Sequence, residues 1–302
     1  MITYRAVTIS CLLVATVPVA AQQAAYVPLA AQLPVGVRSL GMGGPWAPTR
    51  DAGTVFVNPA NAGTTNSMSL GASRFGSAGT LAYAATSSSF GSRGLAIGVA
   101  WLDYGTSESA RPTWEALGVR GANDGLSAMA VAAGSLTFKG IRWGAAAKLL
   151  QERIANSHDA TPAFDVGATK DVGPVSAGLT IQNVGASLEL GGATTPLPMR
   201  YVLGATTQTT DLGPFDVSAA ASLSVRRDGF TSAGGGIDVS YLVLEGYTIA
   251  FRAGAQRAEA LSVNPFTVGA TLAMDRFSLD YAYQDLKAPL RGSVHSVGIR
   301  VR

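Results

Sequence analysis

From residue 215 onward, the chain alternates apolar residues with small or polar ones in segments of about ten positions. A period of two places each set on one face of a β-strand, and ~9–11 residues are enough for a tilted strand to cross a bilayer. The second face carries mainly Gly, Ala, Ser and Thr with single charges, which suits a barrel interior. The pattern therefore favours a membrane-spanning barrel over a soluble sandwich. The three clearest apolar sets are Phe215, Val217, Ala219, Ala221, Leu223 and Val225; Tyr247, Ile249, Phe251 and Ala253; and Phe277, Leu279, Tyr281 and Tyr283.

Similar segments begin near residue 63 and continue to the end of the chain. They predict an all-β fold, a transmembrane antiparallel β-barrel of about fourteen strands, and bacterial single-chain barrels require an even count. The expected strands centre on residues 68–70, 81–83, 97–99, 129–131, 143–145, 164–166, 179–181, 201–203, 219–221, 237–239, 249–251, 268–270, 279–281 and 297–299.

The connections between these segments alternate in length. Membrane barrels combine short periplasmic turns with longer outer loops. The expected short turns are 91–93, 138–140, 171–173, 211–214, 245–246 and 275–276, and the expected long loops are 105–125, 152–162, 186–198, 257–265 and 286–293. Two outer connections, 76–79 and 227–229, are short. Aromatic residues near the strand ends suggest interfacial girdles, namely Trp101, Tyr104, Trp143, Tyr201, Phe215, Tyr247, Phe266, Phe277 and Tyr283.

Composition agrees with a barrel. Charged residues make up 14% of the chain, which also contains 36 glycines, whereas soluble domains average about 25% charged residues. The net charge of +3 comes from scattered basic residues, so nucleic acid is not an expected partner.

The first 21 residues have the features of a secretory signal peptide. Arg5 supplies the positive charge, residues 6–19 form the apolar core, and residues 19–21 offer a small-residue cleavage site. The alternative is a membrane anchor, but the run is short and contains Pro18. The single cysteine, Cys11, lies within this segment. We expect a bacterial outer-membrane protein with a signal peptide at 1–21, a plug segment at 22–62 and a barrel at 63–302.

The plug segment contains a glycine-rich run at residues 36–44. The run lacks the Gly-Lys-Ser/Thr of a P-loop and follows no strand, which argues against nucleotide binding. With the later motifs it resembles the N-terminal signature of the PorV/PorQ family within the FadL-like outer-membrane proteins. Residues 182–185, 196–198 and 278–283 also look like this family. The residues that carry the signature are Arg38, Gly41, Met42, Gly43, Gly44, Asp51, Asn58, Pro59 and Ala60.

The resemblance implies a fourteen-stranded barrel whose N-terminal segment folds inward as a plug. Two departures stand out. Residues 61–63 replace the usual continuation of the motif, and residues 299–302 lack the terminal aromatic residue common in outer-membrane barrels.

Eight charged residues fall on the face opposite the lipid. Buried charges need partners, so these residues are expected to pair with one another and with the plug; the alternative is a lumen that selects ions. They are Arg142, Lys148, Asp165, Asp216, Asp238, Arg252, Asp280 and Arg300.

The two histidines do not suggest catalysis. His158 falls in an expected outer loop, and His295 shares a face with apolar Val297 and Ile299. A catalytic site needs a nucleophile, a base and an orienting group together, and a metal site needs more ligands than His158 with Asp159. We expect no enzymatic activity, cofactor or metal.

The resemblance offers two functions for the barrel. The first is assistance to type IX-like protein secretion, with secretion-system components or secreted cargo as partners. The alternative is FadL-like passive uptake of a small hydrophobic molecule, and a structural barrel in the outer-membrane lipid is a third reading. The loop at 105–125, with Trp114 and Leu117, suits either a partner surface or a ligand entrance.

Overall fold

The computed structural model describes residues 28–44, 51–75, 79–104, 125–154, 156–257, 263–286 and 292–302. The expected signal peptide lies outside these residues, as do residues 105–124 with Trp114 and Leu117.

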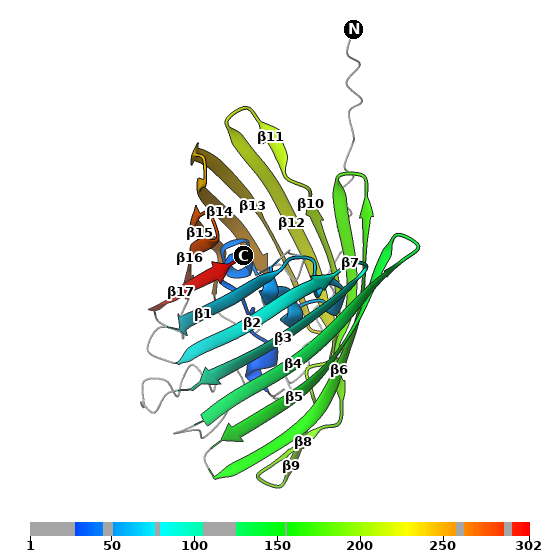
Figure 1. Cartoon of the computed structure of the whole chain (residues 1–302). Helices are drawn as coiled ribbons and strands as arrows, with labels where there is room; N and C mark the ends of the chain where they lie inside the picture. Colours follow the sequence, from blue (N-terminus) through cyan, green and yellow to red (C-terminus); the bar gives the residue numbers. More distant parts are fainter. Residues whose placement is uncertain are drawn as a thin grey trace.

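Within the described residues, fourteen strands form a closed antiparallel barrel (Figure 1). Neighbouring strands pair in order, β10 pairs with both β7 and β12, and the seam closes between β1 and β17. The predicted fold is therefore confirmed. The barrel strands are β1 (Ser67–Phe75), β2 (Thr80–Phe90), β3 (Arg93–Asp103), β4 (Gly125–Phe138), β5 (Ile141–Ile154), β6 (Ser157–Val172), β7 (Val175–Gly185), β10 (Arg200–Thr207), β12 (Phe215–Arg226), β13 (Thr231–Leu244), β14 (Tyr247–Arg257), β15 (Val263–Met274), β16 (Phe277–Leu286) and β17 (Gly292–Val301).

Three short strands are not members of the closed ring. β11 (Thr210–Leu212) pairs with β12 alone, while β8 (Leu188–Leu190) and β9 (Ala193–Thr195) pair with each other. The second pair forms a hairpin within the expected loop at 186–198.

One expected outer loop is wrong. Residues 152–162 continue the strands, with β5 ending at Ile154 and β6 beginning at Ser157. Their paired register runs without interruption from Ile141–Lys170 to Ile154–Ser157. Strand pairing satisfies the backbone groups here, so the two strands extend further outward than their apolar alternation indicates.

The two faces of the wall differ as the alternation predicts. Large apolar side chains lie exposed on the outside, with Phe251 65% and Phe277 56% accessible, and His295 shares this outer face. Such a belt suits lipid rather than water. Tyr104 is an exception to the predicted girdle, because it is 1% accessible and faces the lumen. In the described residues, no helix has the length and apolar character needed to span a membrane.

Residues 28–44 and 51–66, here called the inner segment, lie inside the barrel (Figure 1). Their elements are short because glycine and proline interrupt them. At the last one, Pro59 occupies the first helical position and Asn58 Oδ1 accepts a hydrogen bond from Ala60 N at 2.9 Å. The elements are η1 (Leu29–Ala31), α1 (Val37–Gly41), η2 (Ala52–Phe56) and η3 (Pro59–Asn61).

The inner segment passes from one end of the barrel to the other. Ala30 N donates to Ser127 Oγ near the outer start of β4, at 3.0 Å. Gly63 N donates to Ser87 Oγ near the short turn after β2, at 2.8 Å. The short turns mark the periplasmic end by the usual rule for such barrels. The segment therefore enters β1 from the periplasmic side.

Candidate functional site

The contact between the inner segment and the lumen wall is the candidate functional site. Its first part lies at α1, which contacts β14 to β17. A Cβ at Gly41 would stand 3.2 Å from Gly269 Cα, and one at Gly254 would stand 2.2 Å from Gly43 N. Gly43 also has φ +78° and donates its N–H to Thr267 Oγ1 at 2.9 Å. Glycines on both sides thus allow backbone to pack directly on backbone.

A row of charges lies beside this contact. Arg38 Nη2 is 3.0 Å from Asp238 Oδ2, and the same oxygen lies 2.5 Å from Arg252 Nε. Asp280 then joins Arg252 to Arg300, with Arg300 Nε at 2.7 Å. The four wall residues of this row come from four strands. Asp238 lies on β13, Arg252 on β14, Asp280 on β16 and Arg300 on β17. Alternating signs let each buried charge meet an opposite one, as a low-dielectric site requires.

The second part of the contact lies at η3, on the opposite side of the lumen. A Cβ at Gly144 would stand 2.2 Å from Ala60 N, and one at Gly167 would stand 2.1 Å from Asn58 Oδ1. A Cβ at Gly94 would stand 2.1 Å from Ala62 O. Side chains at these inward positions would occupy the space of the inner segment.

Neutral hydrogen bonds complete this second contact. Gln182 Nε2 donates to Phe56 O at 3.1 Å and to Val57 O at 2.6 Å. Thr169 accepts from Asn58 Nδ2 at 3.3 Å and donates to Asn61 Oδ1 at 3.2 Å. These bonds satisfy backbone and amide groups that would otherwise be buried without partners.

The structure brings together only some of the residues singled out from the sequence. In the signature, Met42 is buried near Gly236, Gly44 has φ +58°, and Asp51 precedes η2. The lumen charges Asp238, Arg252, Asp280 and Arg300 form the row with Arg38. Lys148 and Asp165 form a separate buried pair, with Lys148 Nζ 2.6 Å from Asp165 Oδ2.

Two of the expected lumen charges stand apart from both groups. Arg142 is half-buried near the short turn before β5, and Asp216 lies opposite Asp211 near the turn before β12. Neither position touches the row of charges described above.

Buried apolar side chains form one cluster along the lumen. Its larger wall residues lie near the outer strand ends, where Leu29 and Leu33 of the inner segment belong to the same cluster. Glu152 is buried beside this cluster and accepts a hydrogen bond from Tyr104. Sequence analysis missed Glu152 because it assigned residue 152 to a loop. Continuing the strand from Lys148 with a period of two would have placed Glu152 on the inward face. The buried wall and hairpin residues include Leu81, Leu102, Leu150, Leu188, Leu197 and Val294.

Arg226 holds the inner segment at the outer rim. Its Nη1 donates to Gln32 Oε1 at 2.8 Å, and its Nε and Nη2 donate to Asp228. Partial burial of Asp228 opposes ionisation, but the hydrogen bonds from Arg226 and from Phe230 N outweigh it and lower the pKa of Asp228.

The wall has a break beside this apolar cluster. β6 and β7 shift register between Phe164 and Val166, where Asn183 has φ +59°. Their outermost pair is Ala163 with Gly185, although β6 extends outward to residue 157. The β8–β9 hairpin adjoins this part of β6.

Side chains rather than a backbone ladder join that hairpin to β6. Asp159 Oδ2 accepts from Glu189 N at 2.7 Å, and Ser157 Oγ accepts from Gly191 N at 2.6 Å. The outer part of β6 is therefore joined to the hairpin by side-chain hydrogen bonds in place of continuous strand pairing.

The described residues contain no group of three or more His, Cys, Asp or Glu that could hold a metal ion. His295 hydrogen-bonds to Tyr281 and Ser293 on the outer face, and His158 pairs opposite Arg153 on neighbouring strands. The site is thus one of packing, ion pairing and apolar contact.

Comparison with models of protein families gives no match, and comparison with curated protein sequences gives none either. Solved structures do match. The toluene transporter TbuX of Ralstonia pickettii superposes with a TM-score of 0.56 at 14% identity, covering 88% of this chain and 98% of that one. A FadL homologue of Pseudomonas aeruginosa gives 0.56 at 11%, covering 92% and 99%. The toluene transporter TodX of Pseudomonas putida gives 0.54 at 12%, covering 87% and 96%.

The strand pairing and the inner segment define a closed β-barrel with an apolar outer belt that encloses an earlier segment of its own chain. Its fold is similar to that of these transporters and of the FadL homologue over most of both chains. At this level of identity the similarity establishes the fold alone.

Proposed function

We propose that this barrel is a passive channel that takes a small hydrophobic molecule from the outer face of the membrane. The apolar cluster in the outer half of the lumen carries the proposal. Leu81, Leu102 and Leu150 point inward from β2, β3 and β5 and are at most 1% accessible. Water-filled barrels have polar interiors, whereas this lining suits an apolar solute.

The structures of similar fold support the same class of solute. TbuX and TodX are toluene transporters. The chemistry of the lumen supports an apolar solute independently of that similarity.

The inner segment closes the path in the structure described. The hollow beside α1, lined by Arg38, Ser69 and Arg300 among others, has a volume of about 10 Å³, close to the least space that one water needs. Passage of a hydrophobic molecule therefore requires a movement of the inner segment or of the wall beside it.

The break beside β6 offers such a route. Leu188 of the β8–β9 hairpin is fully buried in the apolar cluster, and the hairpin closes the wall where β7 leaves β6. Displacement of the hairpin would connect the apolar cluster with the surrounding lipid. A hydrophobic molecule could then leave sideways without crossing the charged part of the lumen.

Uptake of toluene and of oleate by proteoliposomes that contain the full chain tests this function, with glucose as a polar control solute. We expect uptake of at least one apolar probe but not of glucose. Leu102→Gln places an amide in the apolar lining and should reduce uptake at least fivefold, while Leu212→Gln, at an exposed position near the short turns, should not. Equal uptake by empty vesicles, or no effect of Leu102→Gln, would contradict the proposal.

The secretion hypothesis rests on the resemblance of the N-terminal motif to the PorV/PorQ family. A strain that lacks the gene separates the two functions. Its growth on long-chain fatty acids and its export of surface proteins are both measured. Lost export with normal growth would favour secretion, and lost growth with normal export would favour uptake. No change in either would contradict both and leave the structural barrel.

A further inference from the structure

The outer face of β4 differs from that of its neighbour β3. Between Leu126 and Leu136, its lipid-facing residues are small, namely Ala128, Ala130, Ala132 and Gly134. Those of β3 are large and exposed, at 57%, 58%, 45% and 44% for Leu95, Ile97, Val99 and Trp101. The small face continues on β5 at Ala145 and Ala147. Large exposed residues follow on β6 at Phe164 and Val166, so β4 and β5 form the bottom of a groove between β3 and β6.

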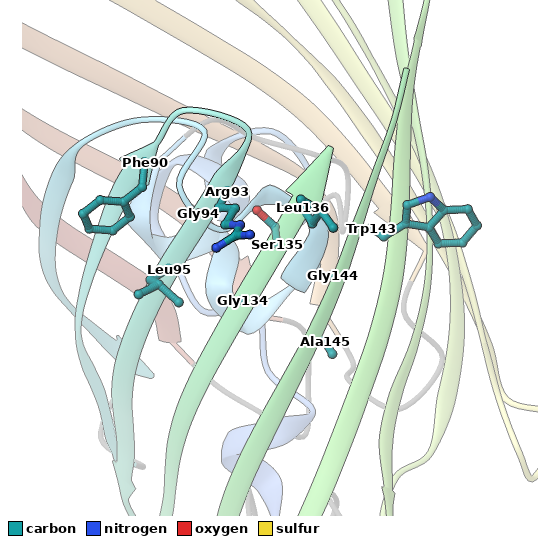
Figure 2. Close-up of a pocket in the computed structure, with 10 residues that line it drawn as sticks. All are labelled: Phe90, Arg93, Gly94, Leu95, Gly134, Ser135, Leu136, Trp143, Gly144 and Ala145. Atoms are coloured by element: carbon teal, nitrogen blue, oxygen red, sulfur yellow. The ribbon is translucent and has the colours of Figure 1, made fainter. Parts of the chain in front are cut away.

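Two adjoining hollows trace this groove across the wall. One, of about 840 Å³, is lined by Ile97, Ala132 and Ala147 among others. The next, of about 710 Å³, is lined by Leu95, Gly134 and Ala145 (Figure 2). Their floors are consecutive outward positions of β4, so we treat them as one feature, the β4 groove.

The length of the β4 groove matches one leaflet of a bilayer. The lining of the two hollows extends along β4 from Ala130 to Leu136, over which the strand rises about 20 Å at ~3.3 Å per residue. At a tilt of roughly 40° this covers about 15 Å of depth, which is half of the ~30 Å hydrocarbon core. A single acyl chain of one leaflet therefore fits its span.

The periplasmic end of the β4 groove carries a positive charge. Arg93 is exposed and lines the hollow next to Gly94 and Gly134, with Phe90 and Trp143 at its sides (Figure 2). A guanidinium group suits a phosphate, and aromatic residues lie at the level of lipid headgroups. The charge therefore stands where the phosphate of a periplasmic-leaflet phospholipid would lie.

On β14 to β16, small outward residues such as Ala253 and Ala270 stand singly or in pairs, and within the described residues these strands have no run of four. On β14 to β16 the outward residues include Phe251, Leu272 and Leu279, all large and exposed. A mobile lipid contacts such a surface from outside, whereas a groove surrounds an acyl chain on three sides and gains more dispersion contacts.

We propose that the β4 groove binds one phospholipid of the periplasmic leaflet, with an acyl chain over Ala130, Ala132 and Gly134 and its phosphate at Arg93. The site lies outside the barrel and is independent of what the lumen transports.

Native mass spectrometry of the full chain, released from detergent and titrated with phosphatidylglycerol, tests the proposal. We expect one lipid to remain bound under conditions that remove all others. Ala132→Leu fills the groove and should reduce this population at least tenfold. The matched variant Ala253→Leu, at an exposed outward alanine of β14, should leave it unchanged. Equal retention by the two variants would overturn the proposal.

The phosphate contact has its own test. Diacylglycerol with the same acyl chains lacks the phosphate, so it should be retained at least fivefold less well than phosphatidylglycerol, and Arg93→Gln should remove the difference. A preference that survives Arg93→Gln would overturn the assignment of the phosphate. A dimer that replaces the bound lipid in the unmodified protein and disappears in Ala132→Leu would show that a second copy fills the groove, and would overturn the proposal.

Discussion

The two sides of the lumen hold the inner segment by different means. On the β3–β7 side, η3 lies against Gly144 and Gly167 and is bonded by neutral groups such as Gln182. On the β13–β17 side, α1 lies against glycines as well, but Arg38 adds an ion pair to the row of wall charges. Glycine packing is common to both sides, and charge distinguishes them.

The two contacts therefore depend on different interactions, steric packing on one side and ion pairing on the other. Contacts through Gly144 and Gly167 depend on the absence of a side chain, so they respond to steric change and little to ions. The contact through Arg38 depends on opposite charges, which are sensitive to substitution and, where partly accessible, to salt. Of the two contacts, the one at α1 is therefore the one that a change of charge can weaken.

The largest effect is expected at Asp280, which joins Arg252 to Arg300 at the centre of the row. Asp280→Asn leaves two buried guanidinium groups short of a partner and should lower the free energy of unfolding by about 3 kcal/mol. Urea unfolding in lipid vesicles, followed by tryptophan fluorescence, measures it. Asp216→Asn removes the same charge beside Asp211 and should change stability by less than ~0.5 kcal/mol. Similar losses in both would show that the row does not pair as described.

Gly144→Ala tests the neutral side. Its Cβ would lie 2.2 Å from Ala60 N, so η3 or the wall must move, and the expected loss is about 2 kcal/mol in the same assay. Gly134→Ala provides the control on the outer face of the same wall, where the nearest atom is 3.8 Å away. A loss in Gly134→Ala as large as in Gly144→Ala would mean that strand propensity, not the inner contact, causes it.

Arg38→Gln should release α1 with a smaller loss, about 1 kcal/mol, because Asp238 keeps its bond to Arg252. Hydrogen exchange locates the effect: amides of residues 40–44 should exchange faster, and those of residues 58–63 should not. Gly144→Ala should give the reverse pattern. Uniformly faster exchange in either variant would show that the inner segment opens as one unit.

The smallest expected effect is the coupling between the two sides. Arg38→Gln and Gly144→Ala affect separate contacts, so their losses should add within ~0.5 kcal/mol in a double-mutant cycle. A coupling well above this value would remove the distinction between a charged and a neutral side.

The fold could be predicted from the sequence because a period of two is a direct consequence of strand geometry. Each membrane-spanning strand must present apolar residues to lipid, so the pattern recurs on every strand. The same rule failed locally at 152–162, where charged residues interrupt the apolar face while pairing continues. Tyr104 was misplaced for a related reason: at a strand end, one position decides between lipid and lumen.

The inner contacts were less predictable. Asp238, Arg252, Asp280 and Arg300 could be assigned to the lumen by alternation, but their order depends on register between strands that are distant in the sequence. Gly144 and Gly167 at inward positions were a signal that a backbone approaches the wall. The partner of each glycine could not be known without the path of the inner segment.

The seam between β1 and β17 has a consequence for the order of assembly. The inner segment precedes β1, and β17 emerges from the ribosome after all the other strands. Val37 lies against Gly298 on the inner face of that seam, within 2.8 Å of where a Cβ would stand. Contact this close against the seam links two steps of assembly. We expect the inner segment to be in place when β1 and β17 pair, so that the barrel wraps around an earlier part of its own chain.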